Sequence, residues 1–347
     1  MGAVAGYKTK TLYGREKTGT WGQDTATSFF VLPIEDGSPI KEKEFVKEGS
    51  LVSYAGYSRA INTKISANAN FSFTLSYTGL EVLFLCAFGY EQINSVQNLG
   101  NGFYRHVIEP DLDISTDYFR TNEGWTTADG LTTNTVKSRR ITVIQDKLIS
   151  QHSLISGLIN RLNLSGNAGD MVKGSVDLLG YDVRRLTFDT SAYSGVPDVV
   201  IFADLMFKVN GTAYNVSSFE FQLSNNLSQT QKNSLYLDEP VRNGKREVTF
   251  KFTLPKYEKD DFFSLYENGS EIRVELRFVK RDGHEIAIIL PRAVISVSTA
   301  NVGGTGVIPN EIEVIALEST TSEVPSGRNV EVYMELINTI STEVWNL

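Results

Sequence analysis

One pattern occurs twice in this chain: a strand of alternating polar and apolar residues, then a short helix-like segment that ends near a glycine. The first copy, NANFSFTLSYTGLEVLFLCAFGY, covers residues 68–90, and the second, REVTFKFTLPKYEKDDFFSLYENG, covers residues 246–269. In both copies the shared Phe-x-Phe-Thr-Leu places apolar residues on one face of a β-strand and polar residues on the other. Such a strand buries one face, so each copy needs a core beneath it. Because the pattern occurs twice, it predicts two similar units in tandem, each with a sheet over a core.

The spacing inside the two copies also supports a duplication. The interval from Leu75 to Gly89 differs by one residue from the interval between Leu254 and Gly269. Residues 79–88 and 258–267 are predicted to form short helices, because each ends at a glycine that suits the left-handed conformation of a helix C-terminus. The second segment also begins with Glu258, Asp260 and Asp261, and acidic residues are favourable at a helix N-terminus.

The remaining sequence predicts short strands joined by turns. Asn210-Gly211 indicates a tight hairpin, and alternating segments predict strands at 200–209, 212–223, 271–280, 285–290, 292–299, 311–317 and 329–337. The predicted fold is mainly β, with two tandem antiparallel β-sandwich or barrel-like domains, each with one short α-helix and long loops. The first domain is expected at 1–192, with a long loop or insertion at about 94–137. The second is expected at 193–347, with loops at 225–243 and 298–310 and a C-terminal arm.

Composition excludes several classes of protein. Of the 347 residues, 33 are basic and 41 acidic, so the formal net charge of −8 lacks the clustered positive charge of a nucleic-acid-binding protein. The single cysteine, Cys86, lies in an apolar segment and is expected to be a buried structural thiol. The longest apolar run, residues 82–90, is too short to cross a bilayer, and the first residues lack a signal-peptide core. A soluble chain made in the cytoplasm is expected.

No catalytic arrangement emerges from the sequence. His106, His152 and His284 are not spaced as ligands, and each is expected at the surface or in a hairpin. The acidic stretch at 111–117 lacks the glycine and terminal glutamate of a calcium-binding loop, and the glycines at 303–306 lack the context of a phosphate-binding loop. The sequence therefore predicts no enzyme activity, no cofactor and no metal site.

Several segments, in this order, resemble the tail tube proteins of long-tailed (siphovirus-type) bacteriophages, in the version in which one chain carries two tube domains. The resembling segments are GREKTGTWGQD (14–24), FFVLPIED (29–36), NTKISANANFSFTLSYTGLEVLFLCAFG (62–89), VSSFEFQLSNNLSQ (216–229), REVTFKFTLP (246–255), ENGSEIRVELRF (267–278) and ILPRAVISVSTANVGGTGVIPNEIEVIAL (289–317). They cover most of the chain, and the resemblance rests on order and pattern rather than on a catalytic motif.

The resemblance implies a structural virion protein of the tail, made in the host cytoplasm and not inserted in a membrane. Two-domain members would form trimeric rings with pseudo-sixfold symmetry. The rings would stack into a hollow tube around a tape-measure protein, and DNA would pass through without specific binding. The resemblance also implies tail terminator and distal tail proteins as partners.

Two sets of residues are candidates for the surfaces of such a tube. The segment 40–57 is rich in charged and then aromatic residues, and the C-terminus is apolar, so candidate ring–ring or subunit contacts are Lys41, Glu42, Lys43, Phe45, Tyr54, Tyr57, Trp345 and Leu347. An ordinary solvated hairpin remains an alternative for 40–57. The polar faces of the repeated strands give the candidate lumen-facing positions Asn70, Ser72, Thr74, Thr249, Lys251 and Thr253.

Two other functions remain open from the sequence. A two-domain β-sandwich module could bind carbohydrate or a receptor through aromatic side chains in polar loops, for which the candidates are Tyr54, Tyr57, Tyr104, Trp125 and Tyr193. The chain could also form the tube of a contractile or secretion apparatus. The duplication argues against that alternative, since those tubes commonly use one domain per chain.

Overall fold

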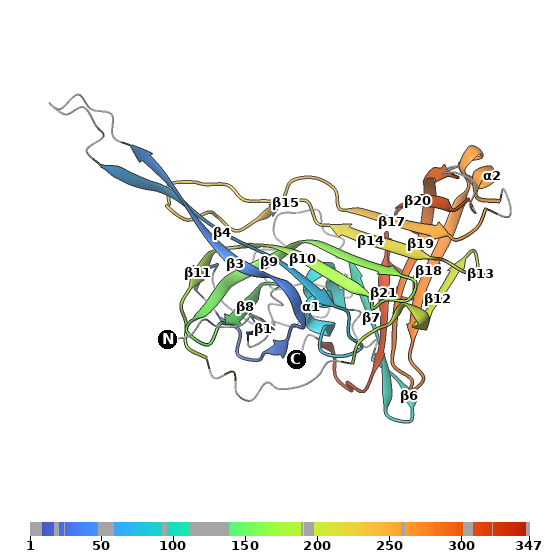
Figure 1. Cartoon of the computed structure of the whole chain (residues 1–347), viewed down its shortest axis with the longest axis horizontal. Coiled ribbons are helices and arrows are strands. Elements are labelled where there is room, and N and C mark those ends of the chain that lie inside the picture. The colour runs from blue at the N-terminus through green and yellow to red at the C-terminus, as the bar shows by residue number, and fades with distance from the viewer. Residues whose placement is uncertain are drawn as a thin grey trace.

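The computed structural model describes residues 9–16, 21–23, 25–47, 59–91, 96–110, 139–188, 190, 198–257, 261–300, 308–320 and 322–344. Figure 1 shows layers of antiparallel strands, with helix α1 in the interior and helix α2 at one end. The elements of the first half are β1 (Lys10–Arg15), β2 (Phe30–Val31), β3 (Ile34–Lys47), β4 (Ala60–Thr74), α1 (Glu81–Phe88), β5 (Gly89–Glu91), β6 (Gln97–Gly100), β7 (Phe103–Pro110), β8 (Ile141–Asp146), β9 (Gln151–Asn167), β10 (Lys173–Gly180) and β11 (Asp182–Arg184).

The second half begins with a short 3₁₀ turn at Phe202–Asp204. Its other elements are β12 (Leu205–Val209), β13 (Thr212–Tyr214), β14 (Ser218–Ser224), β15 (Leu227–Ser228), β16 (Val241–Arg242), β17 (Glu247–Leu254), α2 (Asp261–Glu267), β18 (Glu271–Val279), β19 (Glu285–Thr299), β20 (Asn310–Ala316) and β21 (Tyr333–Asn338).

The same set of strand pairings occurs in each half. In the first, β2 pairs with β1, β1 with β8, and β8 and β11 with the first part of β9; β3 pairs with β4, β4 with β10, and β10 with the last part of β9. The second half repeats these pairings. Strands β13, β12, β18 and β21 take the places of β2, β1, β8 and β11, and strands β14, β17, β20 and β19 take the places of β3, β4, β10 and β9. The predicted fold class, two tandem antiparallel β units with one short helix each, is confirmed.

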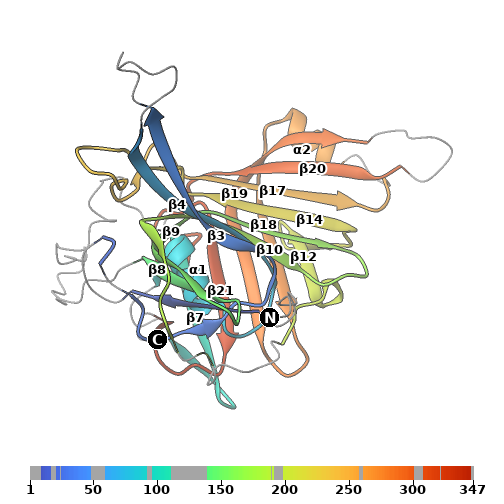
Figure 2. The same cartoon turned by 60° about the vertical axis from the view of Figure 1, so that its left-hand side comes forward.

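Pairing between β9 and β14 joins the two halves into one sheet. Arg161–Asn167 lies opposite Ser218–Ser224, antiparallel and without a bulge. The resulting shared sheet, as we call it, runs in the order β3-β4-β10-β9-β14-β17-β20-β19. Figure 2 shows most of these strands side by side.

The core lies on one face of the shared sheet. Phe71 and Phe73 of β4 and Phe250 and Phe252 of β17 are at most 1% exposed, as the strand pattern predicts. Every residue of α1 is buried, which explains why its sequence after Glu81 is apolar on all sides rather than amphipathic. Gly89 ends α1 with φ of 107° and Gly269 follows α2 with φ of 59°, so both glycines have the predicted left-handed conformation.

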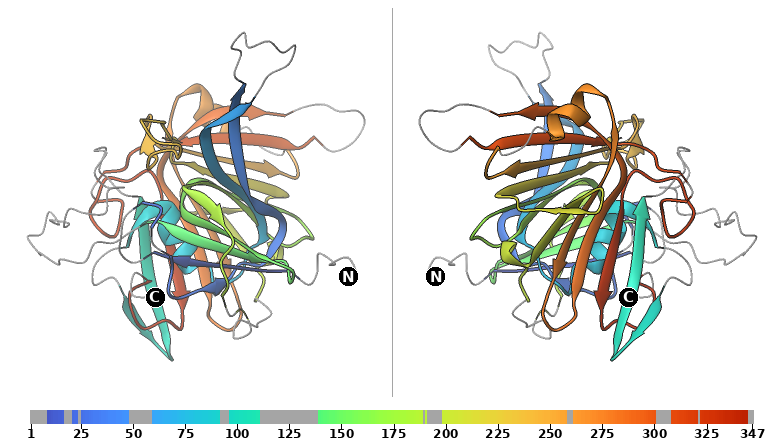
Figure 3. Two further views of the ribbon diagram at one scale, coloured as in Figure 1. Left: turned by 90° about the vertical axis from the view of Figure 1, so that its left-hand side faces the viewer. Right: turned by 90° about the vertical axis from the view of Figure 1, so that its right-hand side faces the viewer.

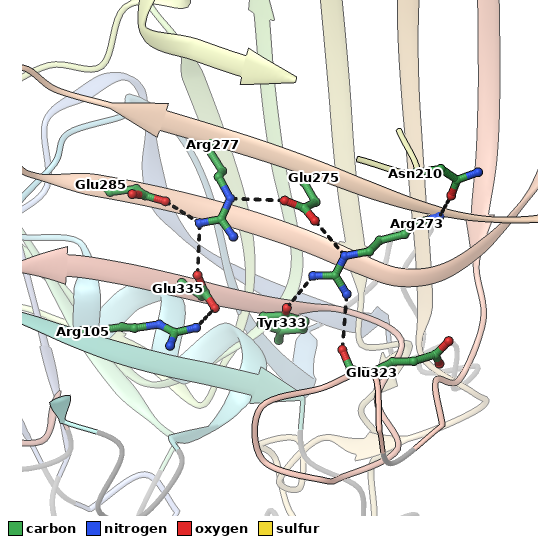
Figure 4. A network of polar contacts seen from close by, with 9 residues as sticks. All are labelled: Arg105, Asn210, Arg273, Glu275, Arg277, Glu285, Glu323, Tyr333 and Glu335. Carbon is green, nitrogen blue, oxygen red and sulfur yellow. Dashed lines mark hydrogen bonds and ion pairs between the residues drawn. The ribbon is translucent and has the colours of Figure 1, made fainter. Parts of the chain in front are cut away.

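An ion-pair network also joins the two halves (Figure 4). Arg105 of β7, from the first half, pairs with Glu335 of β21, and the Arg277 Nη1 of β18 lies 3.2 Å from the other oxygen of Glu335. The same Arg277 nitrogen lies 2.6 Å from Glu285 of β19. Because β21 also forms backbone pairs with β7, charges and backbone bonds hold the same strands together.

The network continues along β18 through Arg273 and Glu275. The Arg273 Nε donates to Glu275 at 2.8 Å, and its Nη2 donates to the Tyr333 hydroxyl at 2.9 Å. Burial raises the pKa of Glu275, but the hydrogen bond and charge of Arg273, with those of Arg277, outweigh burial, so the pKa lies below its usual value.

Some sequence predictions of secondary structure were wrong. The segment at about 94–137, expected to be a long loop or insertion, is not all loop, because it contains β6 and β7 and β7 pairs with β21 from the far end of the chain. The two strands expected at 285–290 and 292–299 form the single strand β19, which is continuous through a bulge in its pairing near residue 296. The strand expected at 200–209 begins only at residue 205, and the strand expected at 212–223 is divided into β13 and β14.

We expect Glu335→Gln to destabilise the fold by about 1–3 kcal/mol, because it removes the buried carboxylate that Arg105 and Arg277 share and leaves Arg277 only with Glu285 and Glu275. The side chain of Glu335 is 5% exposed. Urea unfolding followed by circular dichroism measures the effect. The matched control is Glu35→Gln, which disrupts the exposed pair of Glu35 with Lys173 and should leave stability unchanged. Equal effects of the two substitutions would contradict a stabilising role for the network.

Stability should also depend on pH through Glu275. Its pKa in the folded protein is lower than the ordinary value of 4.5, so its contribution is present above pH 4.5 and is lost as the pH falls through the folded-state pKa. The stability difference between the natural protein and Glu275→Gln should therefore be largest near neutral pH and shrink towards pH 3. A difference that is constant over this range, measured by urea unfolding, would exclude the linkage.

Candidate assembly surfaces

The face of the shared sheet opposite the core is polar from β4 to β17 and becomes partly apolar at β20 and β19, where Ile315 and Val297 are exposed. Adjacent strands β4, β10, β9, β14 and β17 align one row of uncharged residues across it: Ser72, Ser175, Asn163, Gln222 and Thr249. This row ends at Ile315 of β20, which is 43% exposed. A sheet normally has one buried face and one solvated face, but here the solvated face continues through both units.

Charged residues flank this row. The neighbouring rows contain Arg161, Lys173 and Lys251 as basic residues and Asp177, Glu220, Glu247, Glu311 and Glu313 as acidic residues. Some are paired within the sheet, such as Lys251 with Glu313 at 3.2 Å. Five acidic and three basic side chains give these strands a net charge of −2, so the face is polar and only weakly negative.

All six candidate positions from the repeated strands lie on this face. They are Asn70, Ser72, Thr74, Thr249, Lys251 and Thr253, and each is half-buried or exposed while its neighbours in sequence point into the core. The structure thus brings the two sets, about 180 residues apart in sequence, onto one surface. The residues of β9, β10, β14 and β20 that share this face were not predicted from the sequence, although the alternation of polar and apolar residues in NLSGN (163–167) and SSFEFQL (217–223) indicates two such strands.

The hairpin of β3 and β4 extends beyond the shared sheet. Residues 40–47 and 60–66, which we call the arm, form a two-stranded ribbon that projects from the molecule (Figures 1 and 3). Large apolar side chains are exposed on it: Phe45 is 57% exposed, Val46 58% and Ile61 48%. A projecting ribbon with apolar side chains in water is characteristic of a protein–protein contact.

A segment of the second half holds the base of the arm. Residues 225–243, between β14 and β17, cross the first half, and we call them the strap. The Leu235 carbonyl accepts a hydrogen bond from the Ile65 N–H at 2.7 Å, and Trp21 Nε1 donates to the Leu237 carbonyl at 3.1 Å. The ring of Tyr236 stacks on Tyr181 with 4.6 Å between centroids. The strap connects β14 to β17, and the arm lies at the connection between their counterparts, β3 and β4. The two segments are therefore equivalent in the two halves.

The candidate contact residues therefore differ in their surroundings. Lys41 lies at the base of the arm, where its ammonium is 2.6 Å from Asp182 and over the ring of Tyr236. Glu42 and Lys43 are exposed on the arm together with Phe45. Tyr54, Tyr57, Trp345 and Leu347 lie outside the described residues.

The end of the described chain packs on the first half. Val344 is fully buried in the main core. The Asn338 side chain donates to Glu81 of α1 at 3.3 Å. His106 Nε2 lies 2.9 Å from the Ile340 carbonyl and its Nδ1 lies 3.0 Å from Glu91. The prediction of a surface or hairpin position was wrong for His106, which is fully buried, because β7 lies beneath the C-terminal segment.

Two buried side chains near the end of α1, Cys86 and Arg139, lie in the interior of the fold. Cys86 is 1% exposed, and burial raises the pKa of its thiol to about 12. Arg139 donates to the carbonyls of Ala87 and Phe88 at the end of α1. Within the described ranges, no group of three or more His, Cys, Asp or Glu side chains could hold a metal ion. None of the helices described here is long and apolar enough to cross a membrane.

Of the aromatic residues considered for a carbohydrate surface, only Tyr104 can be located. It lies on β7 and is half-buried, and Trp125 and Tyr193, like Tyr54 and Tyr57, lie outside the described ranges.

A comparison with protein families agrees with the fold. No curated protein matches the sequence. The family described as phage tail tube protein matches residues 6–316, which include both copies of the repeated strand–helix pattern, the arm and the strap. Because this match covers well over half of the chain, the protein belongs to the phage tail tube protein family.

Proposed function

We propose that three copies of this chain form a ring with pseudo-sixfold symmetry, and that rings stack into the hollow tail tube of a siphovirus-type phage. Membership of the tail tube family supports a structural role in the virion tail. The repeated pairing pattern supports two equivalent positions per chain. We place the division between them at 192/193, so that residues 1–192 and 193–347 each fill one of six positions.

The single observation that carries this proposal is the polar face of the shared sheet. A surface that passes DNA without binding it should lack both apolar patches and clustered positive charge. Apart from Ile315, the rows of side chains on its six central strands are polar, and they carry a net charge of −2. We assign this face to the lumen, with Asn70, Ser72, Thr74, Thr249, Lys251 and Thr253 among its residues. A tape-measure protein would occupy the lumen before DNA does, and terminator and distal tail proteins would close the ends.

We assign the arm to contacts between rings. It projects past the sheet, and its exposed Phe45, Val46 and Ile61 need a partner to leave water. The strap holds the arm through Ile65, Lys41 and Thr63, whose carbonyl accepts a hydrogen bond from Gln231 Nε2 at 2.6 Å. The distal residues Glu42, Lys43 and Phe45 would then reach a neighbouring ring.

Negative-stain electron microscopy across a concentration series, with sedimentation in parallel, tests the function. We expect rings with a sixfold outline or hollow tubes that grow with concentration. A particle that stays monomeric at every concentration and binds a glycan would contradict the tube and favour a binding module.

Substitution Phe45→Glu tests the arm. It should shorten or abolish tubes and leave single rings, because a charge replaces an apolar contact, while the fold is unchanged since the side chain is mostly in water. The matched control is Met206→Glu, on β12, where the natural side chain is 47% exposed. Tubes of natural length from Phe45→Glu would show that the arm does not join rings.

A further inference from the structure

The residues after the last strand are held on the first half by hydrogen bonds and by a buried apolar side chain. Residues 339–344, which we call the C-terminal segment, follow β21 and form no strand, and Val344 at their end is fully buried in the main core. The Asn338 amide donates to Glu81 of α1 at 3.3 Å, and its oxygen accepts from the Ile340 N–H at 2.9 Å. Release of the C-terminal segment would break no strand pairing.

His106 of β7 connects this segment to a buried carboxylate. Its Nε2 lies 2.9 Å from the Ile340 carbonyl oxygen, and its Nδ1 lies 3.0 Å from an oxygen of Glu91 on β5. The side chains of His106 and Glu91 are both 0% exposed. The imidazole therefore bridges the C-terminal segment and Glu91 in a site closed to solvent.

The two oxygens that face the ring determine how many protons it needs. A carbonyl oxygen can only accept a hydrogen bond, so Nε2 must carry a hydrogen atom. If the ring carried that hydrogen alone, the Nδ1 lone pair would face an ionised carboxylate of Glu91 at 3.0 Å, and burial would strengthen the repulsion. The contact is favourable only with a second proton between Nδ1 and Glu91, whether this proton is on the nitrogen or on the oxygen.

The charges around His106 favour that second proton. Two carboxylates face the ring, Glu91 of β5 and Glu81 of α1. Burial raises the pKa of Glu81, and its hydrogen bonds and the charge of His106 offset only part of the rise. Arg105, the preceding residue, points to the opposite face of β7 and pairs with Glu335.

We propose that His106 and Glu91 hold one shared proton when the C-terminal segment is docked, and that loss of this proton releases the segment. The inference concerns the single folded subunit and is independent of the proposed ring and tube. Release would uncover the core around Val344, while β21 stays paired with β7 and β19.

The direction of the pH dependence follows from the number of protons in each state. Near neutral pH a free imidazole is mostly neutral and a free carboxylate is ionised, so the undocked pair holds no shared proton. The docked pair holds one proton more. Docking is therefore strongest below the ordinary histidine pKa of about 6.5 and weakens as the pH rises, by up to about tenfold for each pH unit.

A cysteine at position 344 reports whether the segment is docked. In Val344→Cys the thiol replaces a fully buried side chain, so iodoacetamide modifies it only when the segment is undocked. Thr342→Cys, at an exposed position, gives the rate without protection at each pH. The ratio of the two rates measures docking. Mass spectrometry of the labelled peptides separates these sites from the buried Cys86.

We expect the protection of residue 344 to fall by up to about tenfold for each pH unit between about pH 7 and 9. Adding Glu91→Gln should abolish this dependence, because an amide can donate to Nδ1 of a neutral ring and no extra proton is needed. The matched control is His284→Gln, which removes another contact between a histidine and a carboxylate, that of Asp282 at 3.0 Å. This control should keep the natural pH dependence.

Two results would overturn the shared proton. One is protection that does not change with pH when His106 and Glu91 are both present. The other is protection that keeps its full pH dependence after Glu91→Gln. Circular dichroism shows whether Glu91→Gln folds. If it does not, His106→Gln takes its place, since its amide can donate to the Ile340 carbonyl without titrating, and a retained pH dependence in that variant would equally overturn the proposal.

Discussion

The pairing of β9 with β14 is the interaction on which the arrangement of the molecule depends. Without it each half would have a separate small sheet, and the pairing of β7 with β21 and the contacts of the strap would be left to join the two halves. Seven residues on each strand, Arg161–Asn167 and Ser218–Ser224, make one sheet from two. Because sheet residues alternate between faces, a continuous register also makes the buried face and the polar face continuous. One broad polar surface results, rather than two separate ones.

Other contacts fix the units to each other so that this sheet is not a hinge. The strap from the second half crosses the first and bonds to Ile65 at the base of the arm. On the other side of the molecule, β21 pairs with β7, and Arg105, Glu335 and Arg277 connect the same strands through charge. Backbone pairs resist shear along strands, and the network adds partly buried ion pairs. A subunit with this internal rigidity would suit the proposed tube, in which every ring presents the same surface to the next.

The duplication is complete in strand pairing but not in exposure. α1 is fully buried while α2 exposes Phe263 and Tyr266, and the arm projects where the strap folds back. These differences lie where one copy of the unit has a covalent neighbour and the other does not. This asymmetry is what the proposed ring of three chains would leave in a single copy.

Much of this was determined by the sequence alone. Alternation identified β4 and β17, their buried phenylalanines and their polar faces, and the glycines after α1 and α2 marked where each helix ends. These features are local, because a strand's period and a helix's final conformation depend on neighbouring residues. Tertiary structure alone decided which strands meet. Backbone hydrogen bonds along an edge carry little sequence information, so the partnership of β9 with β14, and of β7 with β21, could not be read from either strand. The burial of His106 and the docking of the strap follow from those partnerships, and they too became visible only in the folded chain.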